Sequence, residues 1–115
     1  MTKNMHTPGP WLIEGVVQNT GSISICAGRF GIADVTNAVS AGDLVLGNSP
    51  RAQMANAQLI AAAPAILADL IDAAAQLRKY ETLHRAKGNA DSLAKAEVNA
   101  ELASRFEQTI AQATA

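Results

Sequence analysis

The sequence predicts an α+β fold, in which an antiparallel β-meander precedes an alanine-rich helical half. Three observations support this prediction. Short segments in the first third alternate apolar and polar residues, and turns containing glycine or asparagine separate these segments. From Ser49 onward the apolar residues instead recur every three or four positions, as on one face of a helix. A length of 115 residues fits a single domain.

Strand, turn and capping signals divide the chain into six segments. The segment Ser22–Ala27 alternates strictly, and Asn19-Thr20-Gly21 and Gly28-Arg29 mark turns on either side of it. Trp11 begins the first strand and is expected to anchor the core beneath Met54–Ile60. The expected segments are an extended arm at 1–10, a β-meander at 11–36 with strands at 11–18, 22–27 and 30–36, a loop at 37–49, and helices at 50–63, 64–87 and 91–113.

Two features shape the helical half. Pro64 lacks a backbone donor and is expected to break or kink the helix. Gly88-Asn89 is expected to end the second helix, and Asp91 or Ser92 to cap the third, which gives an antiparallel hairpin. Alanines along both arms would let the two backbones approach closely, but alanine buries little area. We therefore expect identical copies to associate and complete the core.

Composition excludes several classes of function. A net charge of -1 provides no general field for DNA, RNA or an anionic membrane. No apolar run of about 18 residues is expected to span a membrane, and the N-terminus does not resemble a signal peptide. The single cysteine, Cys26, is compatible with a reducing compartment, so a cytoplasmic location is expected. His6, His84 and Cys26 lack the spacing of metal ligands.

No catalytic constellation is recognisable, and no cofactor is expected. Cys26 has no histidine that the sequence places beside it, no GxSxG elbow occurs, and Gly28-Arg29-Phe30-Gly31 does not open a helix as a phosphate-binding loop would. Paired carboxylates suited to hydrolysis are also missing from the pattern. We expect a protein that is not an enzyme.

Two arginine–aromatic pairs are candidates for ligand binding: Arg29 with Phe30 at a hairpin tip, and Arg105 with Phe106 on the last helix. Arginine can bind a phosphate through two hydrogen bonds, and an aromatic ring can stack on a base. The alternative is that both phenylalanines belong to the core and both arginines are solvated. Arg51, near a helix start, is a further candidate for binding an anion.

Two islands of sequence carry a resemblance to a known group of proteins. His6–Trp11 reads HTPGPW, and Ala55–Pro64 reads ANAQLIAAAP. In this order they resemble a group of small phage and prophage proteins that begin with HTPGPW and carry ANARLIAAAP. Gln58 replaces the arginine of that group. That group is similar to the phage sponge proteins that counter Thoeris and CBASS defence.

The resemblance implies a viral protein that binds and sequesters a cyclic nucleotide without cleaving it. The signals of this kind are of the cyclic ADP-ribose type or are cyclic oligonucleotides. It also implies a homo-oligomer acting in the host cytoplasm. Two alternatives stay open: an inhibitor that binds a host defence complex, as an anti-CRISPR does, and an enzyme that acts on the same signals.

Overall fold

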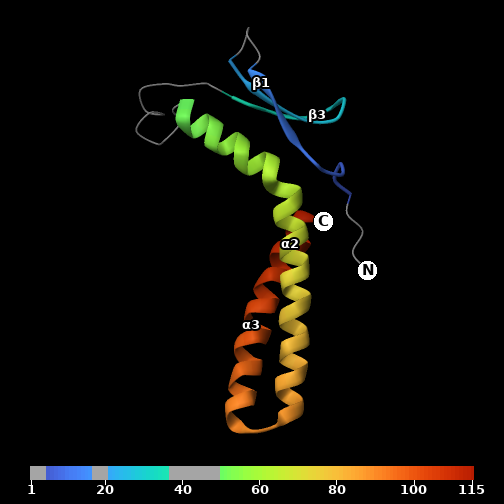
Figure 1. Cartoon of the computed structure of the whole chain (residues 1–115), viewed down its shortest axis with the longest axis vertical. Coiled ribbons are helices and arrows are strands. Elements are labelled where there is room, and N and C mark those ends of the chain that lie inside the picture. Colours follow the sequence, from blue (N-terminus) through green and yellow to red (C-terminus); the bar gives the residue numbers. More distant parts are fainter. Residues whose placement is uncertain (1–4, 17–20, 37–49) are drawn as a thin grey trace. The chain divides into compact units, whose positions relative to one another are not determined.

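The computed structural model describes residues 5–16, 21–36 and 50–115, with side chains in the last range from Ala52 onward. It contains three strands and two helices, β1 (Leu12–Val16), β2 (Ile23–Ala27), β3 (Phe30–Val35), α2 (Pro50–Lys87) and α3 (Ala90–Ala113) (Figure 1). The chain divides into two compact units. One is Thr7–Ala65, and the other is Ile66–Ala115 together with the described residues Met5 and His6. The predicted loop at 37–49 lies outside the described residues.

The sheet is the predicted antiparallel meander, with strand order β1-β2-β3. Ile25 in the central strand lies opposite Ile13 of β1 and Ala33 of β3. The β2–β3 connection has Gly28 at φ +60°, a left-handed conformation that glycine adopts without steric cost. The sequence therefore predicted the strand order and the tight turn at Gly28-Arg29. β1 and β2 each begin one residue later than expected, and β3 ends one residue earlier.

A small apolar core joins the sheet to the first part of α2. Its buried members are Ile23 and Ile25 of β2 and Ala57 of α2. Trp11 packs against this cluster, and its Nε1 donates a hydrogen bond of 3.0 Å to the carbonyl oxygen of Thr7. The predicted role of Trp11 as a core anchor next to the helix is confirmed.

The two sequence islands meet in this same unit. A Cβ atom placed on Gly9, from HTPGPW, would lie 3.0 Å from the Cβ of Pro64, the last residue of ANAQLIAAAP. Trp11 from the first island and Ala57 from the second belong to one core. Close packing of the N-terminal segment on α2 thus gives both islands a structural role.

Gln53 ties the helix to the sheet through polar contacts. Its side chain is buried, and its Nε2 donates to the carbonyl oxygens of Gly21 at 2.8 Å and Val35 at 2.9 Å. Gly21 lies two residues before β2, and Val35 is the last residue of β3. One amide group therefore satisfies two backbone acceptors and fixes the first turns of α2 against the sheet.

The two helices predicted at 50–63 and 64–87 form one helix, which is a correction to the sequence analysis. Pro64 lies inside α2, and the helix continues through it for all 38 residues. A proline inside a helix removes one backbone hydrogen bond, but flanking apolar and alanine residues favour continuation. The boundary between the two compact units falls directly after Pro64, between Ala65 and Ile66.

Helix α2 is also long and apolar enough to cross a membrane by length and composition alone, with a mean hydropathy of 1.5 in its most apolar window. This differs from the expectation that no segment would reach that length. However, every window of about 18 residues on this helix that starts at Ala52 or later contains Asp69, Asp72 or a later charged residue, and the two earlier windows contain Arg51. Carboxylates are costly at the centre of a bilayer, and alanine contributes much of the hydropathy.

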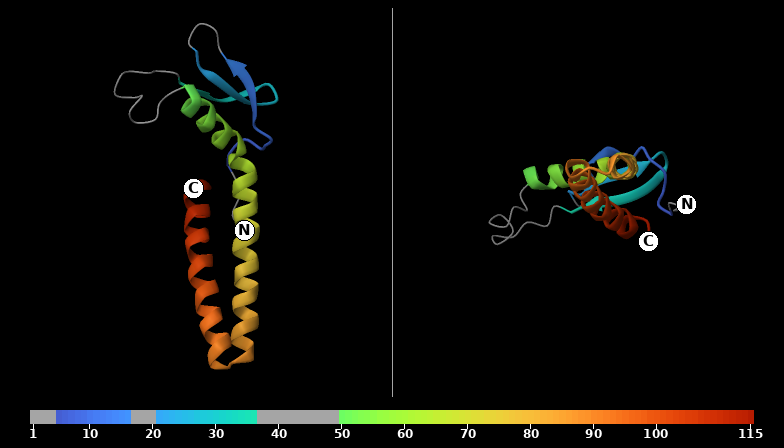
Figure 2. Two further views of the ribbon diagram at one scale, coloured as in Figure 1. Left: turned by 60° about the vertical axis from the view of Figure 1, so that its left-hand side comes forward. Right: turned by 90° about the horizontal axis from the view of Figure 1, so that it is seen from below.

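The second unit is the predicted antiparallel hairpin, in which α3 returns beside the C-terminal part of α2 (Figure 2). Asn89 caps α3, because its side-chain oxygen accepts a hydrogen bond of 2.8 Å from the backbone N–H of Ser92. The cap is thus Asn89 rather than the predicted Asp91 or Ser92. Ala74, Ala96 and Ala103 are buried, so alanine does permit the close approach of the two helices.

Replacing Gln53 by alanine should destabilise the sheet unit by about 1–3 kcal/mol, because two carbonyls in partly buried hydrogen bonds would lose their donor. Trp11 is the only tryptophan, so its fluorescence during urea unfolding reports on this unit. Gln58→Ala is the matched control, since Gln58 is an exposed glutamine on the same helix. Equal unfolding midpoints for the two variants would contradict the role given to Gln53.

Candidate functional site

The predicted binding residues lie in different units. Arg29 and Phe30 are at the β2–β3 tip, and the ring of Phe30 is 64% exposed. Arg105 is exposed on α3, and Phe106 beside it is half-buried. Neither unit by itself brings the two pairs together. The alternative that placed Phe30 in the core is wrong, and the side chain of Arg51 lies outside the described residues.

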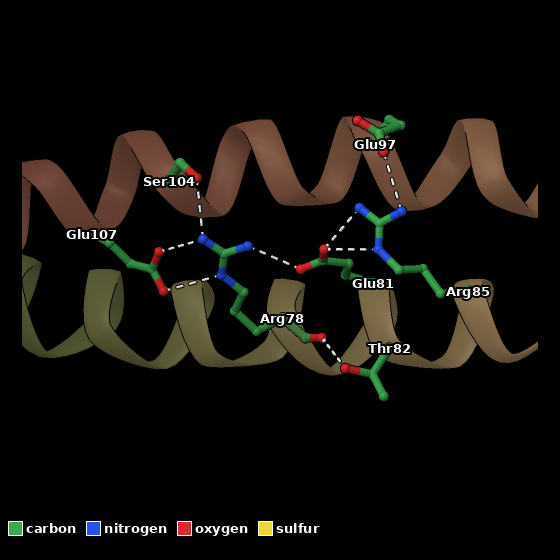
Figure 3. A network of polar contacts seen from close by, with 7 residues as sticks. All are labelled: Arg78, Glu81, Thr82, Arg85, Glu97, Ser104 and Glu107. Carbon is green, nitrogen blue, oxygen red and sulfur yellow. Dashed lines mark hydrogen bonds and ion pairs between the residues drawn. The ribbon is translucent and has the colours of Figure 1, made fainter.

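Charged residues join the two helices of the hairpin along one side (Figure 3). Arg78 of α2 donates through Nη2 to a carboxylate oxygen of Glu107 and, at 3.1 Å, to Oγ of Ser104, both on α3. Its Nη1 lies 2.9 Å from Glu81 on its own helix. Arg85 binds Glu81 at 2.9 Å and Glu97 of α3 at 3.1 Å. We call these six residues the polar clasp.

The polar clasp shifts the pKa values of Arg78, Glu81, Arg85 and Glu107, because the two carboxylates accept hydrogen bonds from the guanidinium groups. The pKa of Glu81 is held below its ordinary value, first by Arg78 and then by Arg85. Arg78 lowers the pKa of Glu107 in the same way. Both arginines in turn have raised pKa values through these hydrogen bonds. The clasp thus stays ionised at any pH above the ordinary carboxyl range.

A groove of about 510 Å³ lies between the two helices near the Gly88-Asn89 turn. Val98 is 65% exposed and Tyr80 45% exposed, so the groove is open to solvent. Its main lining residues are Tyr80 and His84 from α2, with Asp91, Lys95, Val98 and Asn99 from α3. We call this the hairpin groove.

The hairpin groove combines aromatic, cationic and amide groups. Lys95 Nζ lies 3.1 Å from a carboxylate oxygen of Asp91, which is one turn earlier on the same helix, so this ion pair positions the cation. Nδ1 of His84 is buried and accepts or donates no hydrogen bond within the part of the chain that the structure describes. A ring for stacking, a cation and free polar atoms are the groups that recognise a base with an attached anion. Such a site can bind a ligand of this kind.

The groove and the polar clasp occupy opposite sides of the hairpin. On α3, Glu97, Ser104 and Glu107 of the clasp point roughly opposite to Lys95 and Val98 of the groove when placed at 100° per residue. The clasp side is satisfied within the chain, and the groove side is open. Within the described ranges, no group of three or more histidine, cysteine, aspartate or glutamate residues could hold a metal ion.

Sequence reasoning missed Tyr80, Lys95 and Asn99 as members of one site. The signal that could have found them is the Gly88-Asn89 turn, because residues at similar distances from a hairpin turn lie side by side. Tyr80 and Asn99 are related in this way, and so are His84 and Lys95. The sequence alone drew attention to His84 only as a possible metal ligand.

A family model for Salmonella phage P22 protein Y8K6 matches residues 1–115, the full length of the chain. The chain belongs to this family. No curated protein and no solved structure shows a significant match to the sequence. The viral origin implied by HTPGPW and ANAQLIAAAP is therefore confirmed at the level of a phage protein family.

Replacing Arg78 by glutamine should lower the thermal midpoint of the hairpin by a few degrees at neutral pH, because three clasp contacts disappear together. The pKa values of Glu81 and Glu107 are lower in the folded state, so this stabilisation is fully present above pH 4.5 and is lost as the pH falls below it. Melting curves by circular dichroism across this range should therefore converge for the two proteins in acid.

Lys79→Gln is the control, since Lys79 is an exposed neighbour that loses the same charge and forms no ion pair within the described residues. A gap between wild type and Arg78→Gln that stays constant at all pH values would show that the carboxylates do not carry the effect.

Proposed function

We propose that this phage-family protein is a non-catalytic sponge that sequesters a cyclic nucleotide immune signal in the cytoplasm of the infected host. The observation that carries the proposal is the hairpin groove, where the Tyr80 ring, the Lys95 cation and the Asn99 amide share one open site. The ring can stack on a base, and the cation can pair with a phosphate. The resemblance of HTPGPW and ANAQLIAAAP to the sponge-like phage group supports the same class of ligand.

Sequestration works by mass action and needs tight binding but no chemistry. The hairpin groove supports this proposal, because its aromatic, cationic and amide groups can bind a nucleotide without taking part in a reaction. The β2–β3 tip is a second candidate contact surface, since Arg29 and Phe30 are both exposed there. Cyclic ADP-ribose isomers and cyclic oligonucleotides both contain bases and phosphates that suit these groups.

An inhibitor that binds a host defence complex is the second candidate function. The exposed apolar side chains of the hairpin favour it, because Leu83 is 51% and Val98 65% exposed. Exposed apolar patches of this kind mark interaction sites. Capture of a stoichiometric host protein, with no small ligand bound, would favour this function over the sponge.

The proposal predicts that the purified protein retains at least one member of a cyclic nucleotide panel after removal of unbound compound. Heating should release that ligand intact, as measured by mass spectrometry. Lys95→Gln should weaken its affinity by about tenfold or more, because a charge-assisted hydrogen bond contributes about 1.5–3 kcal/mol. Lys79→Gln should bind like wild type.

An Arg29→Gln variant distinguishes the β2–β3 tip from the hairpin groove. Loss of binding in Arg29→Gln but not in Lys95→Gln would place the ligand at the β2–β3 tip. Release of a cleaved product would favour an enzyme. Retention of no cyclic ADP-ribose isomer and no cyclic oligonucleotide would exclude the sponge.

A further inference from the structure

The groove side of the hairpin continues as an apolar strip along both helices. On α2, Ile66, Leu77 and Tyr80 recur at spacings that keep them on one helix face, and on α3 Val98, Leu102 and Phe106 follow each other every four residues. We call these six residues the apolar side. Ile66 is 48% exposed, Tyr80 45% and Val98 65%, while Leu77, Leu102 and Phe106 are half-buried.

We infer that a second copy of this chain covers the apolar side, with α3 packed antiparallel on α3 of the partner around a two-fold axis beside Leu102. Two helical hairpins that bury such strips against each other form a four-helix bundle, with helices about 20° from antiparallel. Tyr80 and Val98 belong both to the apolar side and to the hairpin groove, so in the dimer the second copy would border the groove. The inference goes beyond the proposed function, because it assigns a partner to this side of the hairpin and does not depend on which ligand the groove binds.

The strip is complementary to itself. An axis beside Leu102 places Val98 of one copy against Phe106 of the other, so the most exposed residue of the strip on α3 meets the largest residue of that strip. A two-fold interface requires this reciprocity: where Val98 of the first copy contacts Phe106 of the second, Phe106 of the first contacts Val98 of the second. The opposite side of the hairpin lacks such a strip, because the polar clasp already occupies it.

Charge complementarity selects a second copy over other apolar partners. Glu101 and Arg105 border the apolar side on α3, are exposed, and form no ion pair within the described residues. Around the proposed axis, Arg105 of one copy and Glu101 of the other lie on the same side of Leu102, about 3 Å apart along the helix direction at 1.5 Å per residue. The two-fold axis therefore produces two equivalent ion pairs, each between Arg105 of one copy and Glu101 of the other.

A bilayer is the other apolar environment that α2 could meet. The border of the apolar side carries both signs of charge, with Asp91 and Lys95 at one end and Glu101 and Arg105 at the centre. An interfacial helix instead presents mainly cations beside its apolar face. The observations therefore favour the second copy, and membrane binding becomes an outcome of the test.

The test measures the mass of the full chain by sedimentation equilibrium over a range of concentrations. We expect twice the 11.9 kDa of one chain, or an even multiple of it. Glu101→Arg alone and Arg105→Glu alone should each weaken association by about tenfold or more, since each places like charges in both symmetric positions. Circular dichroism checks that helix content is unchanged.

The decisive measurement restores the opposite charges at positions 101 and 105 across the interface. The double variant Glu101→Arg, Arg105→Glu should associate like wild type, and so should an equimolar mixture of the two single variants, because each pairing then joins opposite charges. Lys79→Gln, on an unrelated part of the hairpin surface, should have no effect.

A monomer at all concentrations would overturn the inference, and so would single variants that associate as well as wild type. Binding of the monomer to vesicles of phosphatidylcholine and phosphatidylglycerol would assign the apolar side to membrane instead. The result is separable from the proposed function: a dimer that retains no cyclic nucleotide removes the sponge alone, and a monomer that retains one removes the dimer alone.

Discussion

Close packing of small side chains governs both units of this protein, because few large residues are available for burial. Ile25 is the largest side chain that is fully buried among the described residues. In the sheet unit Ala57 sits on Ile23 and Ile25, and Gly9 leaves room for Pro64. In the hairpin Ala74, Ala96 and Ala103 fill the space between the helices. Alanine allows a short interhelical distance but removes little apolar surface from water.

Polar contacts compensate for this limited burial in the two units. Gln53 bonds two carbonyls of the sheet, and the polar clasp joins α2 to α3. Exposed ion pairs stabilise only weakly when isolated, but Arg78 and Arg85 share Glu81 and so form a network. The clasp also makes the two sides of the hairpin different. The charged groups on the clasp side are paired within the chain, while Tyr80 and Val98 on the other side are exposed.

Local patterns were sufficient to predict the meander, the tight turn at Gly28-Arg29, the core role of Trp11 and the helical hairpin. They failed at Pro64, where a strong local signal suggested a helix boundary but the helix continues. Helix propensity on both sides and packing of Gly9 against Pro64 are non-local effects that a single residue does not reveal. The cap of α3 was predicted two or three residues too late for a simpler reason, because Asn89, Asp91 and Ser92 are all good capping residues.

The candidate site was harder to predict than the fold, because pairs of neighbours in sequence drew attention away from pairs across the hairpin. Arg29 with Phe30 and Arg105 with Phe106 are adjacent along the chain but lie in separate units. Tyr80 and Asn99 come from two helices and share a groove only once the turn fixes their alignment. Membership in the Salmonella phage P22 protein Y8K6 family places the chain among phage proteins, and the groove supplies the chemistry from which a ligand can be proposed.

In the inferred dimer, the apolar sides of two hairpins pack against each other around a two-fold axis beside Leu102. Oxidative cross-linking tests it most directly, with Leu102→Cys introduced into a Cys26→Ser background that removes the only native thiol. A covalent dimer should form rapidly, because the two new thiols would lie beside the two-fold axis. Ser104→Cys in the same background, on the clasp side, should cross-link far more slowly. Equal cross-linking rates at the two positions, or no cross-linking at position 102, would rule out this dimer.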